Sequence, residues 1–482
     1  MAENTQDWLF PSPRLPVSGR PLEDFGGHRT ALALGLLGAG LTGLFFFAHW
    51  SILLVGAVVV LVLSAMESEP FLLFMIFMIP LGWSLKTEGL LRDTPSIVRS
   101  LVIVGFFLSR LCRGRLGVRR LLSSFPARAS LFFFGVITVP IIFGWMHYST
   151  HFLWTGSCIG FFFLVSEWAD SPERIRKILS VLLYSAIITV VFAFLQEVVG
   201  GYTSLWLYLY PLGESFQEWR GRATSFLGSD NSLAAYLNLV LPFALACYVL
   251  GKGKWKRLGG WTFGLGCVAL VTTQSIGGTV AFFSILVLAI FCFARSRTKK
   301  LALLAALCVL GYLFYVLRPI LNPAHTEEAI GSDAAGRLLL WITAWNYFVH
   351  SPLIGVGWGN FTDLYGFDIP ILQPGMYAAH NTYLQLLAET GLLGFVAFFS
   401  LVVQSWRQAW SQLRSSVDFF DRALAFGVLG ALLSVLVHGF LDYLLESQIA
   451  TLFWVVLALL VASGRLQRRP VAGRVGMSGA QA

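Results

Sequence analysis

Long, uninterrupted apolar runs are the feature that most constrains the fold of this chain. A helix that crosses a membrane needs about 20 mostly apolar residues, because the hydrocarbon core of a bilayer is about 30 Å thick. Fourteen runs approach this length, and the third and fourth are the weakest. They lie at 31–49, 51–66, 70–85, 96–110, 130–147, 151–167, 177–198, 232–250, 260–275, 277–294, 301–318, 382–404, 423–440 and 446–463. Because the runs are continuous rather than alternating, they predict an all-α polytopic membrane protein with about 12–14 transmembrane helices, and not a β-barrel.

The composition supports the same class of protein. Hydrophobic residues make up 56% of the 482 residues, and charged residues only 12%. A soluble domain carries about 25% charged residues, so this chain has too few polar groups to cover a soluble surface. We therefore expect a lipid bilayer as its environment and no nucleic acid as a partner, despite the net charge of +9. The six cysteines include no C-x-x-C pair, so neither a zinc site nor a disulfide framework is predicted.

The positions of the basic residues predict the orientation. When residues 1–30 form a cytoplasmic tail and the spans alternate across the bilayer, most of the 34 lysines and arginines lie on the cytoplasmic side. Both termini are then cytoplasmic. This pattern divides the chain into that tail, a first membrane bundle (31–198), a second membrane domain (199–463) with a large outer loop at about 319–381, and a basic tail (464–482).

The few arginines that remain on the outer side require an explanation. Arg220 and Arg222 precede Asp230 and Asn231, and either of the latter two can cap the following helix. The N-terminus of that helix would then face the outer side, where its free N–H groups favour an anion. Two nearby arginines strengthen the case for a phosphate or pyrophosphate ligand. The alternative is that the arginines only extend to the membrane interface.

The outer loop holds a second arginine motif. Arg337 lies four residues before Trp341, and Trp345 follows at the same spacing, which fits an amphipathic helix at the membrane interface. The glycine-rich run at 355–361 predicts tight backbone turns. A dinucleotide fold is rejected, because no strand precedes the run.

The third motif begins with His380, at the outer mouth of a span. A histidine there can accept a proton from a hydroxyl near neutral pH, although a structural role is the alternative. Glu389 falls within the membrane, where an ionisable group suggests a function. Nine residues at 100° each place it opposite His380, so we expect it to hold helices together. The outer side carries no D-x-D motif and no cluster with metal spacing, which argues against a metal-dependent mechanism. We expect no role for the other histidines, His438 among them.

These motifs resemble the O-antigen ligase and polymerase superfamily. The segment from Arg222 to Asn231 resembles the element that precedes a transmembrane helix in that family, and Arg337 with the run at 355–361 resembles its large periplasmic loop. The segment from His380 to Gly394 resembles its H-N-x-x-L-x-x-L-x-E-x-G-x-x-G signature, which includes Asn381, Glu389 and Gly391. The similarity covers about residues 200–463, whereas the first seven spans resemble the family only in hydropathy.

The resemblance implies a fold and an activity. Members of the family are inner-membrane glycosyltransferases of the GT-C type, which move a glycan from undecaprenyl pyrophosphate on the periplasmic side. The acceptor is lipid A–core, a second lipid-linked glycan or a protein hydroxyl. They are metal-independent, inverting enzymes without a cofactor. By motif match, Arg222 and Arg337 would hold the donor pyrophosphate, with Arg220 beside them, and His380 would act as the base or orient the acceptor. Asn231, Asn381, Glu389 and Gly391 would be structural motif residues.

One position departs from the family pattern. Many members carry Ser-Arg-Gly at a short outer turn, where this chain has Ser275-Ile276-Gly277. Either a third cation is unnecessary, or Arg220 or Arg318 replaces it.

Two other classes of protein stay open: a transporter of lipid-linked glycans, which would often show repeats and charges at the midplane, and a membrane scaffold. The arginines and the histidine at the outer face favour the enzyme.

Overall fold

A computed structural model describes residues 50–81, 94–142, 150–198, 222–321, 327–361, 364, 378–445 and 447–468. By internal contacts the chain divides into two compact units, residues 1–59 and 60–482. Of the first unit the structure describes the beginning of one helix, and every feature considered below lies in the second. The division predicted at residues 30, 198 and 463 stays a prediction.

The described residues form helices and contain no strand, which confirms the all-α class. The helices are α2 (Trp50–Ala65), α3 (Glu69–Phe77), α4 (Thr94–Cys112), α5 (Val118–Leu121), α6 (Phe125–Ile142), α7 (Thr150–Trp168), α8 (Pro172–Val198), the short 3₁₀ helix η3 (Ser225–Leu227), α10 (Asp230–Leu250), α11 (Gly253–Thr273), α12 (Ile276–Phe293), α13 (Arg297–Leu321), α14 (Glu327–His350), α16 (Thr382–Ser415), α17 (Phe419–His438) and α18 (Ser447–Gln467).

Eight of the described helices are long and apolar enough to cross a membrane, or nine if a bent pair formed by α2 and α3 counts as one span. The chain is therefore a multi-pass membrane protein, with fewer such helices in its described part than the 12–14 expected. The predicted run at 31–49 lies outside the described residues. Helices α4, α7 and α11 form where they were predicted, but polar residues such as Arg99 in α4 and Lys254 in α11 lower their hydropathy.

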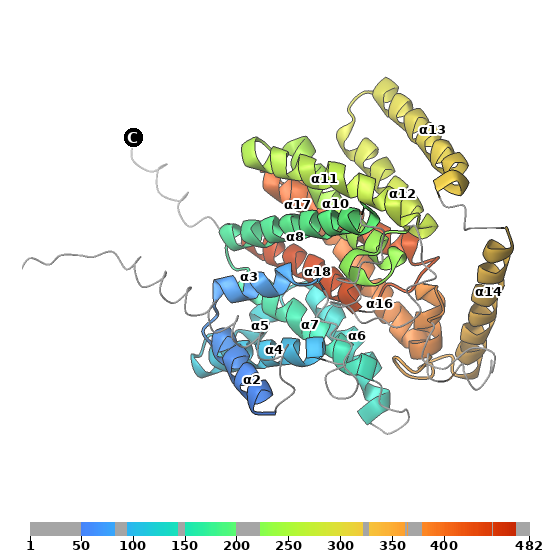
Figure 1. Cartoon of the computed structure of the whole chain (residues 1–482). Helices are drawn as coiled ribbons and strands as arrows, with labels where there is room; N and C mark the ends of the chain where they lie inside the picture. The colour runs from blue at the N-terminus through green and yellow to red at the C-terminus, as the bar shows by residue number, and fades with distance from the viewer. Residues whose placement is uncertain are drawn as a thin grey trace, which may run out of the picture. The chain divides into compact units, whose positions relative to one another are not determined.

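Helices α10, α17 and α18 form the core of the second unit. Figure 1 shows them in the middle, with α11 and α12 on one side and α6 and α7 on the other. Small residues allow α17 to approach α10 closely: a side chain at Gly427 would collide with the ring of Phe243, and one at Gly430 with Pro242. Such close crossings are typical of membrane helices, because packing rather than hydrophobic burial drives their association.

A buried carboxylate at the C-terminal end of α7 joins four helices. Glu167 is 1% exposed and lies 2.9 Å from Arg110 of α4 and 3.0 Å from Arg465 of α18. Arg120 of α5 lies 3.6 Å from the same carboxylate. A charge with this little solvent needs its partners, so the ion cluster fixes the positions of these helix ends.

Candidate functional site

The turn that joins α17 to α18 anchors the start of α16. The carbonyl oxygens of Gly439 and Asp442 accept the N–H of Thr382 at 2.7 and 3.1 Å. The hydroxyl of Thr382 also donates to the Asp442 carbonyl at 2.8 Å. The beginning of α16 is therefore held on residues 439–445, although the two segments lie far apart in the sequence.

His380 stands immediately before this helix. The N-cap of α16 is Asn381, whose side chain accepts the N–H groups of Tyr383 and Leu384, as is typical of asparagine at this position. The backbone of His380 takes the left-handed conformation, with φ of +46°. Its Nδ1 lies 3.0 Å from Oδ1 of Asp442, and since an ionised carboxylate only accepts, Nδ1 carries the proton. In the described part of the chain, Nε2 of His380 makes no hydrogen bond, and the side chain is 31% exposed.

Asp442 stays ionised in this position. Burial raises the pKa of its carboxyl, but the hydrogen bond from His380 and the charge interactions with His380 and His438 lower it more. The pKa therefore lies below the ordinary value of an aspartate. An ionised carboxylate bound to Nδ1 orients the imidazole and stabilises it when Nε2 accepts a proton.

Arg222 comes to the same region from the other side of the core. It precedes η3, and its Nε donates to the carbonyl of Thr273 at 3.0 Å. Its guanidinium forms an ion pair with Asp230, the first residue of α10, whose side chain is fully buried. The carboxylates of Asp230 and Asp442 are close enough to repel each other.

The cap of α10 differs from the expectation. Its N-cap is Ser229, whose hydroxyl accepts the N–H of Ser232 at 3.0 Å. The prediction that either Asp230 or Asn231 caps this helix is wrong, because each of the two side chains has another partner. Asp230 pairs with Arg222, and Asn231 accepts a hydrogen bond of 2.6 Å from the hydroxyl of Ser275, the N-cap of α12. Asn231 therefore ties the N-termini of α10 and α12 together.

Arg337 reaches the turn from α14. Its Nη1 donates to the carbonyl of Leu441 at 2.6 Å, one residue before Asp442. The predicted outer loop at 319–381 thus contains a long helix that presents this arginine. Arg220, the third arginine predicted at the site, lies outside the described residues.

The structure brings together three residues that the sequence singled out separately. Arg337 and His380 contact the 439–445 turn, at the Leu441 carbonyl and at Asp442. Arg222 is paired with Asp230, whose carboxylate lies near enough to Asp442 for the two negative charges to interact. We call Arg222, Asp230, Arg337, His380 and Asp442 the polar cluster. Its two carboxylates were not predicted. Asp442 follows a span by four residues, but nothing in a single sequence pairs it with His380, 62 residues earlier.

Glu389 and Gly391 serve a different contact. The glycines at 355, 357 and 359 have φ between +69° and +103°, so the predicted tight turns are confirmed. The N–H groups of Val356 and Gly357 donate to the carbonyls of Ala388 and Glu389 at 2.8 and 2.9 Å. The Glu389 carboxylate accepts from the N–H of Phe361 at 3.3 Å and from Gln385 at 2.9 Å.

Helix α16 bends where this loop docks. Gly391 has φ of +59° and ψ of −163°, and a side chain there would collide with the backbone of Leu353 and Ile354. The N–H groups of Leu392 and Leu393, freed by the bend, donate to the carbonyls of Pro352 and Leu353 at 2.8 and 3.1 Å. The glycine is thus required both by its conformation and by the close approach of the loop.

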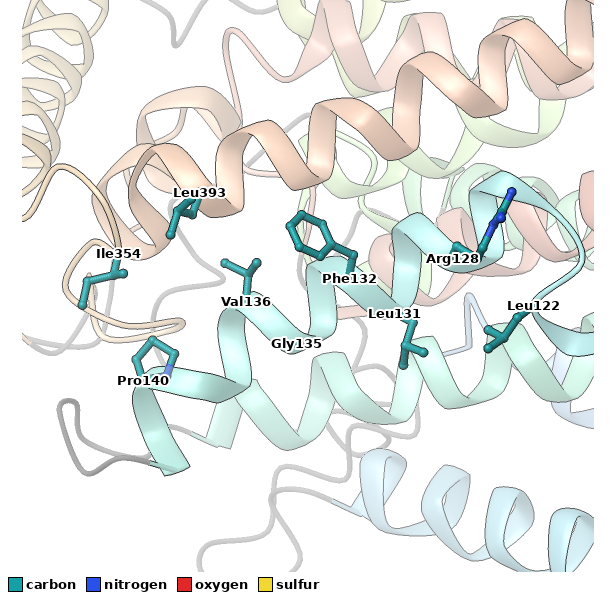
Figure 2. A pocket seen from close by; sticks show the side chains of 9 residues that line it. All are labelled: Leu122, Arg128, Leu131, Phe132, Gly135, Val136, Pro140, Ile354 and Leu393. Carbon is teal, nitrogen blue, oxygen red and sulfur yellow. The ribbon is translucent and has the colours of Figure 1, made fainter. Parts of the chain in front are cut away.

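An apolar groove lies beside this bend. Figure 2 shows side chains from α6, from the loop and from α16 around a cavity of about 590 Å³. Eight of its nine lining residues carry no charge, and Arg128 stands toward one end. The lining residues are Leu122, Arg128, Leu131, Phe132, Gly135, Val136, Pro140, Ile354 and Leu393.

No three side chains of histidine, cysteine, aspartate or glutamate in the described residues lie close enough together to hold a metal ion. The chemistry available in the polar cluster is that of two guanidinium groups, two carboxylates and an imidazole.

Fold and cluster together define a multi-pass α-helical membrane protein with a polar centre formed by helix ends and connecting turns. Comparison with known families then gives its relationship: the family described as O-antigen ligase matches residues 261–399. The exopolysaccharide production protein ExoQ of Rhizobium meliloti (strain 1021) is 29% identical over 230 residues. That alignment covers 44% of this chain and 52% of ExoQ, so the chain matches about half of that relative's length. The resemblance to the O-antigen ligase and polymerase superfamily is confirmed.

Proposed function

We propose that this protein is a glycosyltransferase of a bacterial inner membrane, with both termini in the cytoplasm and a GT-C type of fold. It transfers a glycan from undecaprenyl pyrophosphate to an acceptor hydroxyl on the periplasmic face, without a metal. The observation that carries the proposal is that Arg337 and the His380–Asp442 pair meet at one turn, with the Arg222–Asp230 ion pair close enough for its carboxylate to interact with that of Asp442. The arginines can bind an anionic leaving group, and the histidine can accept the proton of an incoming hydroxyl.

The donor pyrophosphate would bind to the arginines. Charge-assisted bonds from guanidinium groups to phosphate oxygens are among the strongest hydrogen bonds in proteins. In the protein without donor, Arg222 is paired with the buried carboxylate of Asp230. The donor would compete for that guanidinium, and Asp230 would hold Arg222 in place until the donor arrives. Charge that develops on the leaving group is then met by groups that are already oriented.

The acceptor would meet His380. Nε2 takes the proton of the acceptor hydroxyl while its oxygen attacks the anomeric carbon of the donor glycan. The bond between that carbon and the phosphate oxygen breaks, and undecaprenyl pyrophosphate leaves with the bonding electron pair. Attack from the face opposite the leaving group inverts the configuration at this carbon. Asp442 stabilises the imidazolium that forms.

The groove of Figure 2 offers a place for part of a lipid chain. It lies along α6, a helix long and apolar enough to span the bilayer, and beside the loop that docks on α16. Its lining is apolar, as a polyprenyl chain requires. We therefore assign it to a segment of a lipid-linked substrate.

The acceptor is the part of the reaction on which the two matches differ. The family description names an O-antigen ligase, which corresponds to transfer to lipid A–core. The name of the relative concerns exopolysaccharide production, which favours a second lipid-linked glycan and hence a polymerase. Because the relative matches the longer part of this chain, we propose the polymerase first and the ligase second. A protein acceptor and a glycan-lipid transporter are the further alternatives.

Reconstitution tests the proposal. The purified protein in liposomes receives an undecaprenyl-pyrophosphate glycan in the presence of a chelator, with either a second lipid-linked glycan or lipid A–core. Wild type is compared with His380→Ala, Arg222→Ala and Arg337→Ala, and with Arg115→Ala and His350→Ala as exposed controls. We expect longer lipid-linked chains from wild type and both controls, and loss of product in the three cluster variants.

The other outcomes separate the alternatives. Transfer to lipid A–core alone would establish the ligase. No product with either acceptor, together with movement of the glycan lipid across the bilayer, would overturn the enzyme and support the transporter. Equal activity of the controls and the cluster variants would refute the assigned site.

A further inference from the structure

The imidazole of His438 is buried next to the polar cluster. His438 is the last residue of α17 and is 1% exposed. In the described part of the chain its Nδ1 has no hydrogen-bond partner. Its carbonyl accepts the N–H groups of Leu441 and Asp442 at 2.9 and 3.1 Å, so it begins the turn that carries the polar cluster. Buried polar groups without partners are rare in native proteins and require an explanation, of which a role toward a ligand is one.

The ring of His438 lies near two charged side chains and against the backbone of a glycine. His438 interacts electrostatically with Asp442 and with Arg337. Its Cδ2 and Nε2 face Gly277, where a β-carbon would lie only 2.6 and 2.9 Å from these atoms. Gly277 is the second residue of α12, so the ring stands against the N-terminus of an 18-residue helix. Helix N-termini favour anions, because their first N–H groups have no partner within the helix.

The charges of the cluster leave a need for one more donor. Arg222 and Arg337 carry two positive charges, and Asp230 and Asp442 carry two negative ones. A diphosphate adds further negative charge that these four groups do not balance. His438 is the buried group in contact with this arrangement that has a ring nitrogen to spare.

We propose that His438 is a third donor-recognition residue, whose Nδ1–H donates a hydrogen bond to an oxyanion of the diphosphate beside Arg337, while its Cδ2–Nε2 edge rests on Gly277 at the start of α12. The inference rests on the proposed function and names a residue to which the sequence assigned no role. The position of His438 also explains why the turn 275–277 has Ile276 where many members of the family have an arginine. Ile276 precedes the glycine that His438 contacts, and His438 supplies from α17 the donor that an arginine at position 276 would supply from α12.

Binding measurements test this assignment separately from catalysis. The protein in nanodiscs is titrated with undecaprenyl pyrophosphate and, as a second probe, with undecaprenyl monophosphate. His438→Gln is compared with wild type and with the matched control His350→Gln, an exposed histidine of α14. We expect His438→Gln to weaken binding of the pyrophosphate lipid about tenfold or more, and His350→Gln to bind as wild type does.

A rescue variant distinguishes ligand recognition from packing. Ile276 is 48% exposed, so an arginine fits there without displacing the core. We expect Ile276→Arg to restore pyrophosphate binding to the His438→Gln protein, which a purely structural role of His438 would not allow. If His438→Gln does not fold, Gly277→Ala replaces it, because the added methyl group displaces the ring and should cause the same loss, again restored by Ile276→Arg.

The possible results have distinct meanings. Unchanged binding in folded His438→Gln, or a loss that Ile276→Arg does not restore, would overturn the role of His438 and leave the proposed function intact. Failure of the wild-type protein to bind either lipid would instead overturn the proposed function together with this inference.

Discussion

Replacement of Asp442 by asparagine tests the role proposed for His380 as the base. Oδ1 of Asp442 lies 3.0 Å from Nδ1 of His380, and asparagine keeps the shape but removes the charge. A hydrogen bond to a charged group contributes about 1.5–3 kcal/mol. Since about 1.36 kcal/mol of transition-state stabilisation corresponds to a tenfold change in rate, kcat for glycan transfer should fall by about 10–150-fold.

The assay is steady-state transfer in proteoliposomes at varied donor concentration. KM for the donor should change little, because Asp442 contacts His380 rather than the arginines assigned to the pyrophosphate. Asp418→Asn, at an exposed aspartate, is the matched control and should keep the activity of wild type. An unchanged kcat in folded Asp442→Asn would refute the role of the pair in proton transfer. A rise in KM with constant kcat would move Asp442 to donor binding.

Asp442→Asn should also change how the stability of the protein depends on pH. The folded-state pKa of Asp442 lies below the value of about 3.9 for an unfolded aspartate, so its ionised form stabilises the fold above that pH. The stabilisation is lost as pH falls through the lowered folded-state pKa. Thermal unfolding in detergent should therefore show wild type above Asp442→Asn by a constant margin from about pH 7 to 5, and the margin should shrink below about pH 4. A margin that persists at lower pH would contradict the ionised state assigned to Asp442.

Three further substitutions test the framework around the cluster. Glu167→Gln removes the buried carboxylate that Arg110 and Arg465 share, and Arg110 keeps only Glu67, so the protein should be destabilised by up to about 3–5 kcal/mol, which thermal unfolding would show. Gly391→Ala forces an alanine to a positive φ and into the docked loop, so it should cost at least about 1–3 kcal/mol and reduce transfer, whereas Gly264→Ala, where the added methyl group meets open space, should do neither. A β-carbon at Gly135 meets no atom within 4 Å, so the side chain of Gly135→Leu can extend into the groove, and a folded variant should lose activity toward long polyprenyl donors more than toward short-chain ones. Equal activity with both donor lengths would remove the groove from the substrate path.

The sequence predicted the cationic side of the site better than the anionic side. Arg222 and Arg337 stood out because the outer side of the predicted topology is poor in cations, and His380 because it begins a recognisable motif. Asp230 was read as a helix cap, since an aspartate before an apolar run is typical of one. Its pairing with Arg222 depends on how the chain enters α10, and a serine one residue earlier takes the cap. Asp442 depends on the docking of α16 on a distant turn, which no local pattern encodes.

For the membrane helices, too, the sequence predicted local features but not those that depend on tertiary packing. Apolar runs predicted where helices form, and α4, α7 and α11 appear at their expected places. Hydropathy did not determine how polar a buried helix can be. Arg99 in α4 packs on the ring of Trp154 and bonds to Ser157, so neighbouring helices provide what lipid cannot.

The extent of the family match bears on what the active unit is. Residues 261–399 contain Arg337 and His380, but Arg222 lies before that segment and Asp442 after it. The hydrogen bond that orients His380 and the cation paired with Asp230 thus both involve residues outside the matched region. A base without its carboxylate is in an undefined tautomer, and one arginine alone does not balance a diphosphate. On the proposed function, the chemical unit is therefore larger than the matched segment, and α10 and the 439–445 turn complete it.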